Sequence, residues 1–180
     1  GSPREVRPPS GLAWPLCEGK EEPRVAFRRP LPNCDLGGER FALIDVGGGS
    51  AEIVLSTGDV IEELHSLPLG AARLTRHFLT ADPPPADEVK RLRRHVREQL
   101  RRTLEAPVPG VLVLASGGSA NALARMVQAQ HGARELKPHG AEVPRATVEH
   151  IYELIRGMDA TARRKLRGLS PDRVDIILAG

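Results

Sequence analysis

The sequence predicts an α/β fold in which a mixed sheet opens with an antiparallel meander and packs against helices. Three observations predict it. Residues 41–67 contain three short β-favouring runs separated by glycine-containing turns. Residues 86–104 repeat apolar side chains at helical spacing. Residues 111–116 form an unbroken apolar run that leads directly into a helical stretch, which is the order of a strand and helix in a layered domain.

The meander is expected first. We place its strands at 41–46, 51–56 and 60–67, because these runs are rich in β-favouring residues. Two short turns separate them, at 47–50 and 57–59, and both contain glycine. The three strands should therefore pair in chain order as neighbouring antiparallel strands.

Two helices should follow the meander. Residues 71–79 can form a helix that the proline-rich stretch 82–85 ends. Residues 86–104 form a longer helix, whose apolar side chains recur on one face: Val89, Leu92, Val96, Leu100 and Leu104. This face should pack on the sheet.

The second half of the chain alternates one strand with further helices. The run 111–116 predicts a strand that is fully buried, because no polar residue interrupts it before its end. Helices are expected at 117–130, 145–156 and 160–167. Near the end of the chain, Ser170 is expected as a helix N-cap with Pro171 at the first helical position.

The composition fits one globular domain. The chain has 180 residues, of which 40% are hydrophobic. We place a proline-rich, poorly structured lead-in at 1–38 and the domain at 39–180. Three Phe, one Trp and one Tyr offer few platforms for base stacking, so nucleic acid is not an expected partner. No secretory segment or membrane-spanning apolar run occurs, and Cys17 and Cys34 lack metal-ligand spacing, so we expect a cytoplasmic protein that does not bind membranes.

The first glycine loop lies between two carboxylates, Asp45 and Glu52. Glycine has no Cβ and tolerates positive φ, so Gly47, Gly48 and Gly49 can form a concave nest of backbone N–H donors, to which the hydroxyl of Ser50 adds another. The two carboxylates can hold Mg²⁺ beside a bound phosphate. A plain glycine-rich hairpin with two solvated acids is the alternative.

A second small-residue turn follows the apolar run 111–116. Ser116, Gly117 and Gly118 lie where the next helix begins, so free N–H groups and the positive end of the helix dipole would face an anion. A tight strand-to-helix turn capped by Ser119 is the alternative. Two such turns after strands point to phosphate more strongly together than singly.

Four stretches resemble successive landmarks of the exopolyphosphatase and guanosine pentaphosphate phosphohydrolase family: IDVGGGSAEIVL, SLPLGAARLTRHF, ASGGSANALARM and GLSPDRVDIILAG. The resemblance covers about residues 41–180. This family belongs to the superfamily of sugar kinases, actin and heat-shock ATPases. The resemblance implies a ribonuclease H-like, actin-like ATPase domain, and specifically the second of two such domains that face each other across a cleft.

The resemblance also implies roles for residues at the two loops. Asp45 and Glu52 would serve Mg²⁺ and the attacking water, as metal-binding and catalytic carboxylates. The backbone of residues 47–50 would hold a phosphate, and residues 116–118 would lie near the continuing phosphate chain. Upstream, EGKEEPRVAFRRPLPN is similar to the family's Glu-Glu-Ala-Arg-Leu segment, in which the second glutamate is the proposed general base. That residue is Glu22 here, although Pro23 departs from the family pattern. An exposed acid in a proline-rich tail is the alternative.

The expected activity is hydrolysis of a phosphoanhydride. The substrate would be the end of inorganic polyphosphate or the 5′ terminal phosphate of guanosine pentaphosphate. The first domain's Asp-x-Gly-Ser-Asn-Ser phosphate loop has no match in residues 1–40, so we expect a second domain truncated at both ends, weakly active without the first domain as its partner. A homodimer stays open. The alternatives are an inert phosphate-binding or interaction domain and an ATP-dependent kinase of the same superfamily.

One basic row remains outside this scheme. Arg93, Arg97 and Arg101 recur at four-residue spacing on the long predicted helix. We interpret the row as the solvated face opposite the apolar stripe, with Glu88 and Glu98 interspersed. A track for polyphosphate or nucleic acid is the alternative.

Overall fold

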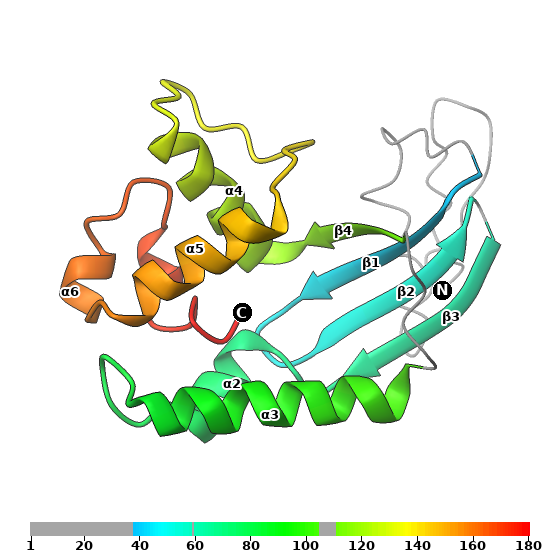
Figure 1. Ribbon diagram of the computed structural model, residues 1–180, viewed down its shortest axis with the longest axis horizontal. Coiled ribbons are helices and arrows are strands. Elements are labelled where there is room, and N and C mark those ends of the chain that lie inside the picture. The colour runs from blue at the N-terminus through cyan, green and yellow to red at the C-terminus, as the bar shows by residue number, and fades with distance from the viewer. Residues whose placement is uncertain (1–37, 59, 105–110) are drawn as a thin grey trace, which may run out of the picture. The chain divides into compact units, whose positions relative to one another are not determined.

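A computed structural model describes residues 38–58, 60–104 and 111–180 of the chain (Figure 1). The expected lead-in at 1–38, with Glu22, lies outside the described residues except for Gly38. The described part of the chain belongs to one structural unit, Gly38–Gly180.

The sheet has four strands in the order β3-β2-β1-β4. They are β1 (Arg40–Val46), β2 (Ala51–Thr57), β3 (Val60–Leu67) and β4 (Leu112–Ser116). The first three form the predicted antiparallel meander, and β4 joins β1 in parallel. The mixed sheet with packed helices confirms the α/β prediction, and each predicted strand end lies within one residue of the observed end.

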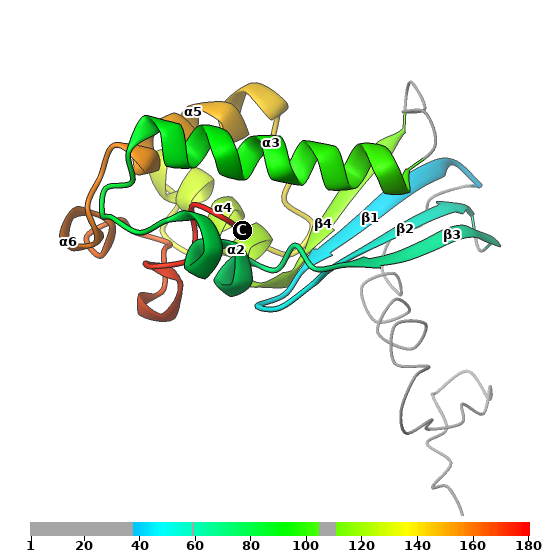
Figure 2. The same cartoon turned by 90° about the horizontal axis from the view of Figure 1, so that it is seen from below.

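The helices follow the predicted order. They are α2 (Ala71–Phe78), α3 (Ala86–Thr103), α4 (Gly117–Gln130), α5 (Arg145–Arg156), α6 (Ala160–Arg163) and the 3-10 helix η1 (Pro171–Arg173). Figures 1 and 2 both show α3 running beside α2 and the meander. The first four helices begin at the predicted residues, because apolar spacing and proline or glycine punctuation agree there.

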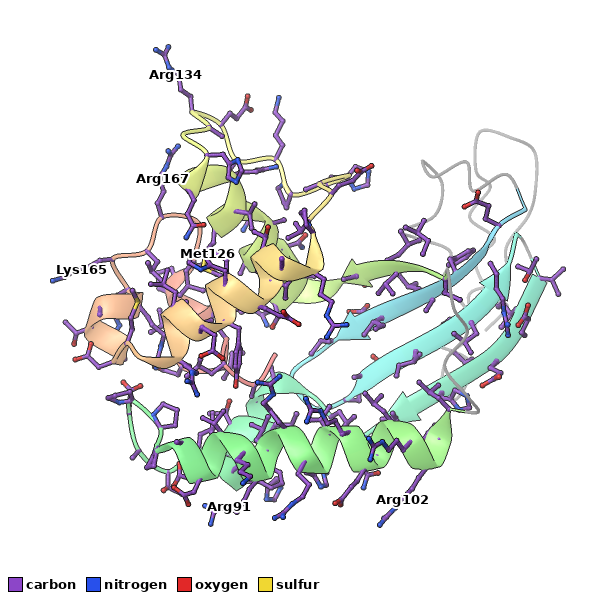
Figure 3. All side chains as sticks on the ribbon, viewed as in Figure 1. Arg91, Arg102, Met126, Arg134, Lys165 and Arg167 are labelled. Atoms are coloured by element: carbon purple, nitrogen blue, oxygen red, sulfur yellow. The ribbon has the colours of Figure 1, made fainter. Side chains whose placement is uncertain are left out.

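Two clusters of apolar side chains form the described core. One joins β2, the end of β3, α2 and α3 through Ile53, Leu67, Leu74 and Leu92. The predicted stripe of α3 belongs to this cluster, with Val96, Leu100 and Leu104 packed at its margin. The other cluster joins α4, α5 and the C-terminal segment: Ala122, Met126, Ile151, Ile155, Leu169, Val174, Ile177 and Leu178. Figure 3 shows Met126 on the side of α4 toward α5.

The burial predicted for β4 is wrong. Leu112 is 44% exposed and Val113 is 59% exposed, although both belong to the unbroken apolar run. Among the described residues β4 pairs only with β1, so it forms an edge of the sheet. Hydrophobicity of the run predicted the strand correctly, but burial depends on neighbours that the run itself does not specify.

Glu88 is also placed differently from the prediction. It was assigned to a solvated face, yet it is buried. Its carboxylate accepts hydrogen bonds from the backbone N–H of Thr80, at 2.9 Å, and from the hydroxyl of the same residue. These bonds tie the end of the α2 segment to the first turn of α3. Both bonds lower the pKa of Glu88 below its ordinary value, and the bond from the Thr80 hydroxyl has the larger effect.

Helix α6 is shorter than the predicted 160–167 because its last residue turns inward. Arg163 is buried, and its guanidinium donates to three acceptors: the carbonyl oxygens of Met158 (2.6 Å) and Val174 (3.0 Å) and the carboxylate of Asp82 (2.6 Å). Tight turns follow, and Gly168, at φ +100°, lies so close to α4 that a Cβ would meet the backbone carbon of Arg125 at 2.6 Å. Tertiary contacts therefore override helix propensity here.

The C-terminal segment begins as predicted and then departs from a helix. Ser170 occupies the N-cap position and Pro171 is the first residue of η1, but the serine side chain makes no capping hydrogen bond. Its hydroxyl bonds the carboxylate of Asp172 instead, which lowers the pKa of that carboxyl. The 3-10 helix ends after three residues.

Candidate functional site

The two glycine loops lie next to each other at one end of the sheet. Strands β1 and β4 are parallel, and the register places Asp45 opposite Ser116. A further bridge joins Val46 to Gly117, beyond the last full pair. Figure 1 shows both strands ending side by side, where α2 and α4 begin. The structure therefore brings together the two turns that the sequence could only present as separate motifs.

The first loop, residues 47–50, is closed by its own backbone. The N–H of Gly47 donates to the carbonyl oxygen of Ser50 at 3.0 Å. The first turn of α2 then binds the outer side of the loop. The carbonyl oxygen of Gly47 accepts from Ala71 N–H at 2.9 Å, and that of Gly48 accepts from Arg73 N–H at 3.0 Å.

These bonds orient the donors of the loop. In a trans peptide, the carbonyl and the following N–H point in opposite directions. Because the carbonyls of Gly47 and Gly48 point toward α2, the N–H groups of Gly48 and Gly49 point away from it. Neither N–H, nor that of Ser50, has a hydrogen-bond acceptor within the described part of the chain. The loop thus presents free donors on the side opposite α2.

One of the two reasons for expecting glycine here is wrong. None of Gly47, Gly48 and Gly49 adopts a positive φ. The other reason, the missing Cβ, agrees with the geometry. Among the described residues, a Cβ at Gly49 would meet no atom within 4 Å, and one at Gly48 would meet only the Cβ of Ala72, at 3.9 Å. The space beside the free N–H groups is open to a ligand.

Gly70 supports the loop from behind, and sequence reasoning missed it. A Cβ at this N-cap of α2 would lie 2.3 Å from the carbonyl carbon of Gly49 and 2.4 Å from Ser50 N. Only a glycine lets the helix approach the loop closely enough for the two backbone bonds. The signal in the sequence was a glycine in Pro68-x-Gly70, directly before the predicted helix at 71–79.

The two carboxylates are cross-strand neighbours. Asp45 on β1 is paired with Glu52 on β2, so both side chains leave the same face of the sheet. Glu52 Oε1 accepts from the hydroxyls of Ser50 at 2.6 Å and Ser66 at 3.2 Å. The hydroxyl of Ser50 was expected to donate to a phosphate, but it donates to Glu52. The backbone N–H of Ser50 remains available to a ligand.

The second loop is held against the first by Gly117. This residue has φ +90°, a region that glycine adopts readily. A Cβ here would lie 2.6 Å from the carbonyl oxygen of Val46 and 2.7 Å from Asp45 Oδ1. The carboxylate of Asp45 therefore lies against the backbone of the second loop, between both sets of donors.

Ser116 and Ser119 have buried hydroxyls at the start of α4. Ser116, rather than Ser119, is the N-cap residue, and its side chain makes no capping bond. Neither hydroxyl has a hydrogen-bond partner among the described residues. Since buried polar groups are nearly always paired, these two indicate that a polar partner belongs here.

Arg173 is a second residue that sequence reasoning missed. Its guanidinium lies against Gly118, where a Cβ would stand 2.1 Å from Cζ. Its Nε also pairs with Asp172 at 3.3 Å. The signal was the arginine in the family landmark GLSPDRVDIILAG, to which no role was assigned. A planar cation beside the second loop adds positive charge where a phosphate would bind.

The residues present fit a magnesium ion bound through few protein ligands. No group of three or more His, Cys, Asp or Glu that could hold a metal occurs in the ranges that the structure describes. Mg²⁺, however, usually keeps several waters and takes one or two carboxylates together with substrate phosphates. Two like charges directly opposite in a sheet are also unfavourable unless something compensates them. Asp45 and Glu52 provide this arrangement.

Comparisons with known proteins agree on one family. The model of the Ppx/GppA phosphatase family matches residues 5–180. Exopolyphosphatase 2 of Mycobacterium tuberculosis is 32% identical over 173 residues, covering 94% of this chain and 54% of that protein. Exopolyphosphatase 1 of Mycobacterium leprae is 33% identical over 183 residues, covering 97% of this chain and 52% of that protein. The chain thus spans about half the length of these curated relatives.

Solved structures agree as well. A Ppx/GppA enzyme from Aquifex aeolicus superposes with a TM-score of 0.71 at 28% identity, over 81% of this chain and 48% of that chain. An exopolyphosphatase from Cytophaga hutchinsonii gives a TM-score of 0.65 at 18% identity, over 79% and 47% of the two chains. These likenesses confirm the predicted fold class.

None of the helices in the described ranges has the length and apolar character needed to span a bilayer.

Proposed function

The chain belongs to the Ppx/GppA phosphatase family, and from this premise we propose that it forms one half of an active site that hydrolyses a terminal phosphoanhydride. The substrate is inorganic polyphosphate or the 5′ terminal phosphate of guanosine pentaphosphate. The other half is a first domain that faces the two glycine loops. The observation that carries the proposal is the meeting of two loops with unpaired donors beside the pair Asp45 and Glu52.

The backbone binds the phosphate in this proposal. The free N–H groups of Gly48 and Gly49 point away from α2 and toward open space, so they can donate to phosphate oxygens without moving. The second loop adds the N-terminal end of α4 and the hydroxyl of Ser116. Preorganised donors of this kind stabilise charge without reorganisation during the reaction.

The carboxylates orient the reacting groups. Asp45 and Glu52 are the residues that would hold Mg²⁺, and the ion would supply charge neutralisation of the phosphate and a site for a water. Glu52 is itself held by the hydroxyls of Ser50 and Ser66, which limits the directions in which its oxygens can point. The carboxylate of Asp45 lies against Gly117, so the second loop limits the orientation of the Asp45 side chain.

The reaction itself is a displacement at phosphorus. A water oxygen forms a bond to the terminal phosphorus, and the bridging P–O bond breaks with its electron pair leaving on the shortened chain. The water proton goes to a carboxylate, for which we propose Glu22, a residue outside the described ranges. Arg173, beside Gly118, is placed to balance charge on the chain that leaves.

Two measurements test the proposal. The first is calorimetric measurement of tripolyphosphate binding to the chain, with and without Mg²⁺. We expect Mg²⁺ to strengthen this binding and Asp45→Asn to weaken it by at least about tenfold. The reason is that a hydrogen bond to a charged group contributes roughly 1.5–3 kcal/mol. The second is phosphate release from polyphosphate by the intact protein that carries this chain. Asp45→Asn and Glu52→Gln should each slow it by about a hundredfold or more.

The outcomes separate this proposal from its rivals. Mg²⁺-dependent binding without any phosphate release by the intact protein would favour an inert binding domain. ATP that displaces tripolyphosphate completely would favour a kinase of the same superfamily. Undiminished release by both carboxylate variants would remove the mechanism.

A further inference from the structure

A basic groove runs between α3 and α5, away from the two glycine loops. The cavity has a volume of about 570 Å³ and six cationic side chains line it: Lys90, Arg93, Arg94, Arg97 and Arg101 from α3 and Arg156 from α5. Glu98 is the one acidic residue among the described residues of its lining. The row that we interpreted from the sequence as a merely solvated face is therefore one wall of a groove.

The five groove cations of α3 lack ion-pair partners among the described residues. None of them has a carboxylate oxygen within 4.0 Å in the described part of the chain, whereas Arg91 on the same helix pairs with Asp87 at 3.7 Å. Arg156, on the opposite wall, pairs with Glu153 at 2.6 Å. Figure 3 shows Arg91 and Arg102 on the side of α3 that faces away from α5.

Like charges stacked along a helix oppose its folding. Lys90 and Arg94, Arg93 and Arg97, and Arg97 and Arg101 are all four residues apart, a spacing at which equal charges repel. Such a row is unfavourable in the free protein, and a bound anion would relieve the repulsion. The groove thus has the charge that an anionic ligand requires, and Glu98 makes no ion pair with the α3 cations within the described ranges.

The length of the row indicates the shape of the ligand. Arg93 and Arg101 are eight residues apart, which corresponds to about 12 Å along the helix axis. A single phosphate cannot contact both ends of such a row, but a linear chain of anionic groups can. One guanidinium group can donate two parallel hydrogen bonds to two oxygens of a phosphate, so arginine is suited to this ligand.

The groove offers no platform for nucleic-acid bases. The part of its lining that the structure describes contains no aromatic residue. The nearby ring of Tyr152 on α5 is already covered by the guanidinium of Arg93, at 5.3 Å from the ring centroid. Single-stranded nucleic acids depend on stacking with aromatic side chains as well as on charge. A phosphate chain without bases therefore fits better.

We infer that the groove between α3 and α5 binds a linear polyphosphate chain at a site distinct from the two glycine loops. That the ligand is a chain of phosphates follows from the groove; that it is the same polymer whose end is hydrolysed rests on the proposed function. A long polymer held in this groove would remain attached to the protein while its end is processed elsewhere.

The test uses two variants with the same change in net charge. Arg97→Glu/Arg101→Glu reverses two charges inside the groove. Arg102→Glu/Arg134→Glu reverses two charges outside it, and Figure 3 shows Arg102 and Arg134 pointing away from α5. Binding of end-labelled long-chain polyphosphate is followed by fluorescence anisotropy at several salt concentrations. Thermal melting of both variants checks folding, and Arg97→Gln/Arg101→Gln repeats the test without new repulsion.

We expect the groove variant to weaken long-chain binding by at least about tenfold and to reduce the slope of log affinity against log salt, because fewer cations contact phosphates. The control should change affinity by about twofold or less. Equal losses in both variants, or none in either, would overturn the inference. Single-stranded DNA that competes as well as polyphosphate would overturn the choice of ligand.

Tripolyphosphate separates this inference from the proposed function. Its Mg²⁺-dependent binding at the glycine loops should be the same in the groove variant and in the unchanged chain. If tripolyphosphate fails to bind at all while the groove variant still loses long-chain binding, the proposed function is refuted. The inference that the groove binds a phosphate chain is then supported. If the groove variant loses only tripolyphosphate binding, the inference that the groove binds a phosphate chain is refuted.

Discussion

Replacing Gly70 with alanine tests how the first glycine loop is held. Gly70 has φ −70° and ψ 148°, an extended conformation that any residue adopts, so the substitution introduces no backbone strain. The added Cβ would, however, lie 2.3 Å from the carbonyl carbon of Gly49 and 2.4 Å from the nitrogen of Ser50. The effect is therefore purely steric, and it falls on the loop that presents the free N–H groups.

The magnitude follows from these distances. Carbon atoms in contact lie about 3.5–4.0 Å apart, so the loop and α2 must separate by more than about 1 Å. Overpacking of this kind costs about 1–3 kcal/mol. The same shift weakens the bonds from Ala71 N–H to Gly47 and from Arg73 N–H to Gly48, each contributing about 1 kcal/mol. We expect a loss of about 2–4 kcal/mol, or about 5–15 °C in Tm for a chain of this size.

The assay compares Gly70→Ala with Gly49→Ala, on the other side of the contact. A Cβ at Gly49 would meet no atom of the described residues within 4 Å, so this control should keep Tm within about 2 °C of the unchanged chain. Both variants should bind tripolyphosphate at least about tenfold more weakly, one because the donors have moved and the other because a methyl occupies the ligand space. If Gly70→Ala melts and binds like the unchanged chain, α2 does not support the loop and the reasoning is refuted.

Three further predictions concern other contacts. Gly117→Ala should lower stability by about 2–4 kcal/mol in denaturant unfolding, because its Cβ would meet β1 at 2.6 Å and its φ is +90°; an unchanged midpoint would contradict the contact. Glu88 has a pKa below its ordinary value because Thr80 donates to it, so it stabilises the fold above about pH 4.3 and loses this effect as pH falls through the folded-state pKa. Glu88→Gln should therefore flatten the acid side of a Tm-against-pH curve, and parallel curves would refute this. Arg163→Leu should cost about 3 kcal/mol by leaving backbone acceptors unpaired. It is measured against Asp82→Asn, which keeps a side-chain oxygen as acceptor, removes only the charge of the partly solvated partner and should cost less.

The order of elements was predictable because local signals agreed with tertiary packing. The ends of β3, α4 and α5 match the predicted residues, since apolar periodicity and turn residues coincide there. Predictions that depended on distant neighbours were wrong. The exposure of Leu112 depends on which strands flank β4, and the early end of α6 depends on acceptors that Arg163 finds in other segments.

The candidate site was predictable as a list of residues and not as an arrangement. Spacing along the chain indicated which glycines and carboxylates to expect at a phosphate site. It could not indicate that parallel pairing of β1 with β4 brings Ser116 beside Asp45, because that pairing spans more than sixty residues of sequence. Gly70 and Arg173 were missed for the same reason, since each acts on a loop remote from it in sequence.

The two helices beside the site use their N-terminal ends differently. The first N–H groups of any helix lack intrahelical partners. In α2, two of these groups bind the carbonyls of Gly47 and Gly48, so the helix end is satisfied by the loop and turns the N–H groups of the loop outward. In α4, the N-cap Ser116 makes no side-chain capping bond and its hydroxyl is buried without a described partner. An anion should therefore bind between the first loop and the start of α4, and α2 should act through the loop without contacting the anion.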